Sequence, residues 1–102
     1  MASPLTEGLS PATQAQFEVL QQRFIAGLPA RWQEIHGAAV PQTLQAALHR
    51  LSGSAGSYGF EGISQRAREA ELLATSGSHA ALAQALTLLE AEIGIARSDA
   101  SA

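Results

Sequence analysis

Cysteine and lysine are both missing from this chain of 102 residues. Without cysteine there is no disulfide framework, no thiolate nucleophile and no cysteine-ligated zinc or iron–sulfur site. Without lysine, all six basic residues are arginines, and nine acidic residues set the formal net charge at −3. Nucleic-acid binding requires clustered positive charge, so this balance argues against a nucleic-acid partner.

Long hydrophobic runs are missing too. No stretch approaches the ~18 apolar residues that span a bilayer, and no basic segment followed by an apolar run begins the chain. We therefore expect a cytoplasmic protein with no membrane partner. The length suits a single domain, since chains usually spend roughly 100 to 200 residues on each. His36 and His79 have no second histidine four residues away and no acidic cluster beside them, so we expect no metal site.

Aromatic residues are scarce, at 5% of the chain, although 46% of its residues are hydrophobic. The core must therefore be built mainly from alanine, leucine and isoleucine, a composition that favours helices. No alternation of apolar and polar residues with a period of two lasts for the length of a strand. The sequence predicts an all-α fold.

The first predicted helix begins at Ser10 and Pro11, a pairing typical of an N-cap followed by proline at the first helical position. Its apolar residues recur at spacings of three and four: Phe17, Leu20, Phe24 and Leu28. Pro29 has no backbone N–H to donate to the preceding turn, and it disfavours helical geometry at the residue before it. We therefore expect this N-terminal helix to be short, or to be kinked or broken near Gly27.

Three further apolar stripes follow, separated by short turns, with Ser78 as the N-cap of the last helix. The stripes consist of Leu44, Leu48, Leu51 and Ala55, then Phe60, Ile63, Ala67, Ala70 and Ala74, and finally Leu82, Ala85, Leu89, Ile93 and Ala96. Helices joined by short turns lie antiparallel, so we expect an up-down four-helix bundle over residues 10–97. Residues 1–9 and 98–102 lack helical periodicity and are expected to form a flexible arm and a flexible tail.

The most unusual stretch follows Leu48, where a histidine precedes a run of small residues inside an otherwise regular helix. At about 100° per residue, His49 lies roughly 100° beyond Leu48 and therefore points to solvent. The residues that share its face are small or uncharged: Gln45, Ser52, Gly53 and Gly56. We expect these neighbours to leave the imidazole accessible to another protein.

Gly53 and Gly56 together destabilise this helix by roughly 1.5 to 2 kcal/mol relative to alanine. Two reasons for them remain open. One is the close approach of a partner's backbone beside His49, and the other is the close packing of a neighbouring helix. An exposed, largely neutral imidazole can itself attack a phosphoryl group through a ring nitrogen.

This segment resembles a motif of the histidine-containing phosphotransfer (HPt) domains of bacterial multistep phosphorelays. In those domains the motif lies in the second helix of a four-helix bundle and reads His-x-Leu-Lys-Gly-[small]-[small]-x-x-x-Gly. Here it reads His49-Arg50-Leu51-Ser52-Gly53-Ser54-Ala55-Gly56-Ser57-Tyr58-Gly59. The resemblance covers roughly residues 13 to 97. It implies that His49 is the phosphoacceptor, that Gly53 admits a receiver domain and that Gly59 makes the turn after the second helix.

The same resemblance implies a phosphoryl carrier in two-component signal transduction rather than an autonomous enzyme. Its expected partners are response-regulator receiver domains, a hybrid sensor histidine kinase, or both, and we expect the carrier to be a monomer. It needs no cofactor of its own, since the receiver supplies the acceptor aspartate and the Mg²⁺ ion.

Ser52 departs from the family pattern, which usually has lysine three residues after the histidine. A lysine neutralises part of the phosphoryl charge, so we expect weaker electrostatic stabilisation here. Ser52 can donate one neutral hydrogen bond and Gln45 another, whereas Arg50 points about 100° away from His49.

Two alternatives remain open. The chain is a non-phosphorylated helical adaptor or dimerisation module in which the glycines serve packing, or it is a degenerate HPt domain that docks receivers without transfer. Four charged residues of the third predicted helix are interpreted as a solvated surface with weak ion pairs: Arg66, Arg68, Glu69 and Glu71.

Overall fold

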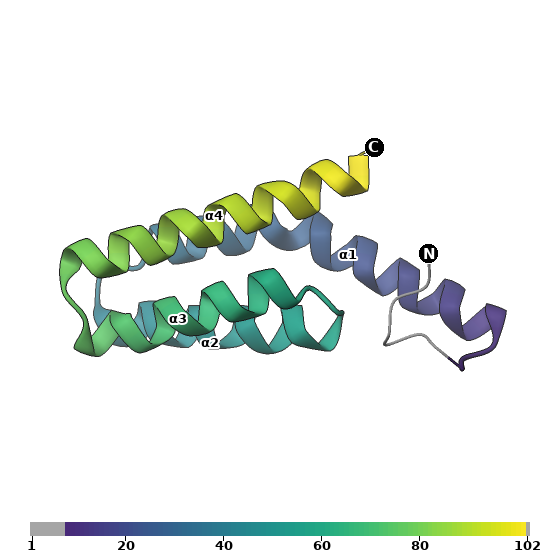
Figure 1. Ribbon diagram of the computed structural model, residues 1–102, viewed down its shortest axis with the longest axis horizontal. Helices are drawn as coiled ribbons and strands as arrows, with labels where there is room; N and C mark the ends of the chain where they lie inside the picture. The colour runs from purple at the N-terminus through teal and green to yellow at the C-terminus, as the bar shows by residue number, and fades with distance from the viewer. Residues whose placement is uncertain (1–7, 102) are drawn as a thin grey trace.

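The computed structural model describes residues 8–101, and these residues form four α-helices and no strand (Figure 1). The helices are α1 (Pro11–His36), α2 (Pro41–Ser57), α3 (Glu61–Ser76) and α4 (His79–Ser101). The predicted all-α class is therefore confirmed. Most of the expected N-terminal arm, residues 1–7, lies outside the described residues. Within the described range, no helix combines the length and apolarity needed to cross a membrane.

Serine caps begin α1 and α4 where the sequence predicts them. The hydroxyl of Ser10 accepts a hydrogen bond from the backbone N–H of Thr13 at 3.2 Å, and Pro11 occupies the first turn of α1. Ser78 does the same for α4, where its hydroxyl accepts from the N–H of Ala81 at 3.1 Å. Each cap satisfies a backbone donor that the first helical turn leaves without a partner.

Of the alternatives expected for α1, a short helix and a broken helix are wrong, whereas a kinked helix is compatible with the structure. The helix continues through Pro29 for 26 residues, and in Figure 1 its ribbon changes direction without interruption. A proline inside a helix removes one backbone hydrogen bond and leaves the others in place. Leu28 and Ile35 are buried on either side of Pro29. Their packing against one core stabilises the helix more than the proline weakens it, so α1 is long rather than short.

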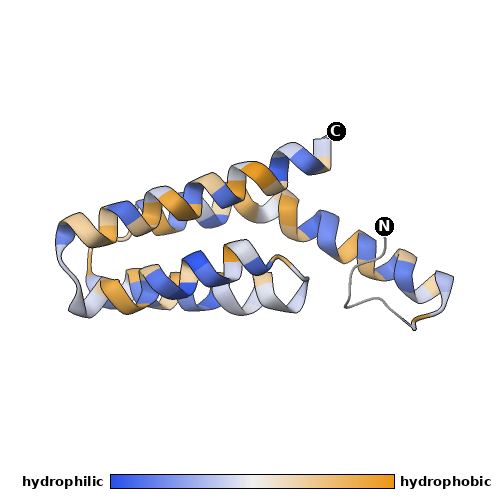
Figure 2. Ribbon diagram, in the orientation of Figure 1, coloured by the Kyte–Doolittle hydropathy of each residue, from blue (hydrophilic) through white to orange (hydrophobic). Residues whose placement is uncertain are grey.

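The core is one cluster built from alanine, leucine and isoleucine with a single phenylalanine, as the composition predicts. Its buried members are Phe24, Leu28, Ile35, Leu44, Ala47, Leu48, Leu51, Ala55, Ile63, Ala67, Ala70, Ala85, Leu89 and Ile93. Leu20 is exposed, contrary to its place in the predicted stripe, because the N-terminal part of α1 extends past the other helices (Figure 1). Figure 2 shows hydrophilic and hydrophobic residues interspersed along this projecting part.

α2 packs against two different helices. Its most extensive contacts are with α3 and it also packs against α1, while α4 packs against α3 and α1. After Ser57 the chain makes a tight turn, in which the N–H of Phe60 donates to the C=O of Ala55 at 2.8 Å. Gly59 has a φ of +86°, in the left-handed region that favours glycine, which agrees with the predicted turn. One flank of α2 therefore meets α3, and another meets α1.

α4 runs to Ser101, so residues 98–101 are helical where the sequence suggests a separate tail. The hydroxyl of Ser101 donates to the C=O of Arg97 at 3.0 Å. These last residues are exposed, and an exposed turn at the end of a helix needs no apolar residues, so the end of the apolar stripe does not mark the end of the helix.

Candidate functional site

His49 projects from the exposed side of α2, with 77% of its side chain exposed. Buried residues on the core-facing side of the helix set this orientation, because α2 can bury its apolar stripe in only one rotation about its axis. They are Leu44, Leu48, Leu51 and Ala55. The exposure of His49 therefore agrees with its predicted position on the helix.

Glu71 of α3 lies beside the imidazole. The distance from Nδ1 of His49 to Oε2 of Glu71 is 3.1 Å, and the Glu71 side chain is only 20% exposed. An ionised carboxylate only accepts hydrogen bonds, so Nδ1 carries a proton and donates it. In the neutral imidazole, Nε2 is then the nitrogen with a free lone pair. One ring nitrogen of His49 is held, and the other is available for reaction.

This contact corrects two expectations. The sequence predicts only small or uncharged neighbours around His49, but Glu71 is a charged neighbour. It also predicts that Glu71 lies on a solvated surface, but this side chain is mostly buried against the imidazole. Helical periodicity does place Glu71 directly after the buried Ala70, at the edge of the face that α3 buries. Which residue of α2 it meets depends on how α2 and α3 cross, and periodicity carries no information on that.

Gly53 and Gly56 have different surroundings. A Cβ atom at Gly56 would lie 3.3 Å from Oγ of Ser64 in α3, which is a tight contact. A Cβ atom at Gly53 would meet nothing within 4 Å in the described part of the chain. Gly56 therefore serves the close packing of α2 against α3, whereas packing within the described chain gives no reason for a glycine at position 53.

Ser52 does not share the open surface of His49. It is 6% exposed, and its backbone C=O accepts a hydrogen bond from the hydroxyl of Ser64 at 3.0 Å. The expectation of a Ser52 hydroxyl presented beside the imidazole is wrong, because α3 covers this turn of α2. Gln45, one turn before His49, is half-buried.

A cleft of about 470 Å³ adjoins His49 on the flank of α2 that faces α1. Most of the residues that line it are of polar or basic type: Arg31, His49, Arg50, Gly53, Ser54, Ser57 and Tyr58. Arg50 forms an ion pair with Glu34 of α1. Arg31, which is not among the predicted site residues, donates from Nη2 to the hydroxyl of Ser54 at 3.4 Å. α1 therefore brings an arginine to the site that no motif in the sequence indicates.

Comparison with protein families matches residues 13–99, most of the chain, to the model of the Hpt domain. The chain belongs to the Hpt domain family. The resemblance noted over roughly residues 13 to 97 is thereby confirmed. Searches of curated proteins and of solved structures gave no match.

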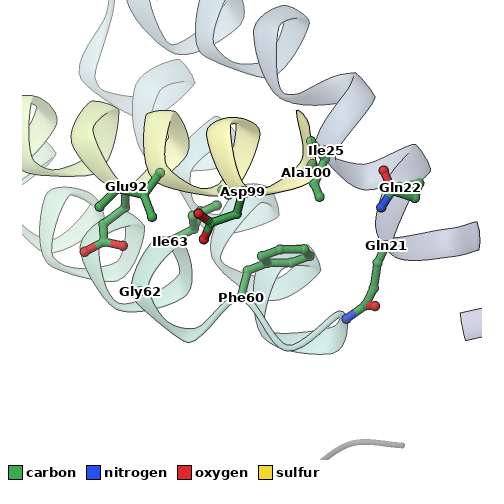
Figure 3. Close-up of a pocket in the computed structure, with 11 residues that line it drawn as sticks. Gln21, Gln22, Ile25, Phe60, Gly62, Ile63, Glu92, Asp99 and Ala100 are labelled. Atoms are coloured by element: carbon green, nitrogen blue, oxygen red, sulfur yellow. The ribbon is translucent and has the colours of Figure 1, made fainter. Parts of the chain in front are cut away.

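Another cleft of this Hpt domain shares no lining residue with the first and lies where α1, the start of α3 and the end of α4 meet (Figure 3). Gln21 donates from Nε2 to the C=O of Tyr58 at 2.8 Å. A Cβ atom at Gly62 would lie 2.9 Å from Cδ of Glu92, so the Glu92 carboxyl lies against the first turn of α3. A negative charge is favourable there, and the N-cap residue Phe60 makes no side-chain hydrogen bond of its own. Gln21 and Glu92 of this cleft therefore lie against the connection between α2 and α3 and the first turn of α3.

Metal-ligating side chains do not gather in the described range of the Hpt domain. Among residues 8–101 there is no group of three or more His, Cys, Asp or Glu residues that could hold a metal ion. The reactive and charged groups at the site are the imidazole of His49, the carboxylate of Glu71 and the two arginines of the adjoining cleft.

Proposed function

We propose that this Hpt domain is a phosphoryl carrier of a two-component phosphorelay and that His49 accepts the phosphoryl group. The observation that carries the proposal is the exposed imidazole whose Nδ1 is held by Glu71 at 3.1 Å, which leaves Nε2 as the nucleophile. Because the neutral imidazole already presents a lone pair on Nε2, no separate base is needed.

In the accepting step, the Nε2 lone pair attacks the phosphorus of an aspartyl phosphate on a receiver domain. The bond between phosphorus and the aspartate oxygen breaks, and the aspartate leaves as a carboxylate. Positive charge develops on the imidazole as the N–P bond forms, and the Glu71 carboxylate stabilises it through the Nδ1–H donor. Transfer to the aspartate of a second receiver is the reverse step.

Such transfer passes through a loose transition state and depends on positioning and on neutralised charge. We propose that the receiver supplies the Mg²⁺ ion for this purpose, so that the chain acts as a carrier with no cofactor of its own and not as an autonomous enzyme. Gly53, with open space around it, is the proposed point of close approach for the receiver backbone.

The proposed partners are response-regulator receiver domains, a hybrid sensor histidine kinase, or both, with this chain as a monomeric, cytoplasmic carrier. The up-down, antiparallel order of the four helices belongs to the same proposal. It is supported by connections of only a few residues between successive helices.

The test is transfer from a receiver domain whose aspartate carries a radioactive phosphoryl group, in the presence of Mg²⁺. We expect label on this chain that is labile in acid and stable in alkali, as phosphohistidine is. His49→Gln should carry no label. The matched controls His36→Gln and His79→Gln, which change two other exposed histidines, should be labelled like the wild-type chain.

Each other outcome contradicts the proposal and supports a different function for this chain. Label that persists in a folded His49→Gln variant contradicts the assignment of the phosphoacceptor. No label together with intact receiver binding indicates a degenerate domain that docks without transfer. Neither label nor binding indicates the adaptor or dimerisation module.

A further inference from the structure

A phosphoryl group on His49 brings roughly two negative charges to the site. The carboxylate of Glu71 is already 3.1 Å from the imidazole, and the chain has no lysine to offset these charges. The compensating charge within this chain must come from arginine. Of its six arginines, Arg31 and Arg50 line the cleft that adjoins His49.

The two arginines differ in whether a carboxylate already offsets their positive charge. Arg50 forms an ion pair with the Glu34 carboxylate, which offsets its charge. Among residues 8–101, Arg31 forms no ion pair with a carboxylate. Its hydrogen bond to the Ser54 hydroxyl is long, at 3.4 Å, and therefore weak. Arg31 is the less compensated of the two positive charges.

Arg31 is also held in place by an aromatic ring. Its guanidinium carbon lies 5.6 Å from the centroid of the Phe24 ring, within the range of a cation–π interaction. Phe24 is buried and packs against Tyr58, with 5.6 Å between the ring centroids. This packing orients the guanidinium before any ligand arrives, which lowers the entropy cost of binding.

The flanks of α2 on either side of His49 carry opposite charges. Glu71 approaches from α3, and Arg31 approaches from α1. Because Nδ1 faces Glu71, Nε2 lies on the edge of the ring away from that carboxylate. Gly53 lines the cleft without contributing a side chain, so no side chain at this position separates the imidazole from the part of the cleft that Arg31 lines.

We propose that the cleft between α1 and α2 binds the phosphoryl group of phosphorylated His49 and that Arg31 binds its oxygens. This inference rests on the proposed function of His49. A guanidinium presents N–H donors in a planar fork that matches two phosphoryl oxygens. Arg31 thereby supplies from α1 the positive charge that a lysine at position 52 of α2 usually supplies in the family pattern.

Phosphoramidate is the donor for the test, because this small molecule reports on the chemistry of His49 without any contribution from receiver docking. Its P–N bond breaks, the phosphoryl group is transferred to Nε2 of His49, and ammonia is released. The reaction is followed by ³¹P NMR on the full chain. The phosphohistidine resonance gives both the rate of phosphorylation and the pH at which the phosphoryl group gains its second charge.

Arg31→Gln should lower the phosphorylation rate by on the order of tenfold, since it removes a charge-assisted pair of hydrogen bonds. The pH at which the phosphoryl resonance titrates should move upward, because a neighbouring positive charge favours the dianion. Arg31→Lys keeps the charge without the planar fork and should be intermediate. Arg23→Gln removes an exposed arginine of α1 outside the cleft and should match the wild-type chain.

A folded Arg31→Gln variant with a rate within twofold of wild type and an unchanged titration overturns this inference and leaves the function of His49 intact. If neither phosphoramidate nor a phosphorylated receiver labels His49 in the wild-type chain, the proposed function is wrong. The proposed binding of the phosphoryl group by Arg31 is then wrong as well. Should thermal unfolding show that Arg31→Gln has lost its fold, Arg31→Met repeats the comparison, because it keeps an unbranched stem and removes only the charged group.

Discussion

Gly53→Ala should stabilise the Hpt domain and at the same time impair its transfer of phosphoryl groups. Gly53 lies inside α2, and a Cβ atom there would meet nothing within 4 Å. Alanine is favoured over glycine in an exposed helix interior by about 0.8–1.0 kcal/mol, and no steric cost reduces this gain. For a domain of this size, 1 kcal/mol corresponds to a rise in Tm of about 4–8 °C, which thermal unfolding followed by circular dichroism measures directly.

Transfer from a phosphorylated receiver should fall several-fold in the same variant, because the added methyl group stands one helical turn from His49, at the point where we propose that the receiver backbone approaches. Gly94→Ala is the matched control. Gly94 is an exposed glycine inside α4 with nothing within 4 Å of its Cβ position, so the substitution should raise the Tm similarly and leave transfer unchanged. Labelling by phosphoramidate requires no docked partner, so Gly53→Ala should lose less of it than of transfer from the receiver, and Gly94→Ala should lose neither.

The reasoning is refuted if Gly53→Ala accepts phosphoryl groups from the receiver at the wild-type rate, because position 53 is then no point of close approach. A Tm that fails to rise contradicts the open surroundings of Gly53. Gly56→Ala provides the contrast within the same helix. Its Cβ atom would lie 3.3 Å from Oγ of Ser64, so the Ser64 side chain must give way and the Tm should rise much less than in Gly53→Ala, or fall.

Two further predictions concern the site and the core. Glu71→Gln should lower the share of the His49 tautomer protonated on Nδ1, by about 2- to 12-fold in the tautomer ratio, because a hydrogen bond contributes about 0.5–1.5 kcal/mol net. Ring ¹⁵N chemical shifts measure this ratio, Glu69→Gln serves as the control, and an unchanged ratio would show that the carboxylate does not hold Nδ1. Leu48→Ala should cost about 2–5 kcal/mol in urea unfolding, because Leu48 is fully buried. Leu72→Ala, at an exposed leucine of α3, should change stability by less than about 0.5 kcal/mol, and equal losses in the two variants would contradict the assigned core.

Local patterns in the sequence determined the helices and the direction in which His49 points. Ser10 and Ser78 cap the helices that they were expected to cap, because a cap depends only on residues within one turn. The apolar stripe of α2 predicts its buried face, and an angle of about 100° per residue then leaves His49 on the exposed side. These features follow from the geometry of a single helix.

The neighbours of His49 were decided only by the tertiary structure. Glu71 and Arg31 reach the site from α3 and α1, and Ser52 is covered by α3, although helical periodicity places Ser52 on the face of His49. α1 likewise continues through Pro29 because Leu28 and Ile35, on either side of this proline, pack on one core. Periodicity specifies which face of a helix is buried. The residues that meet across two helices depend on the angle and register at which the helices pack, and these depend on the side chains of the whole core together.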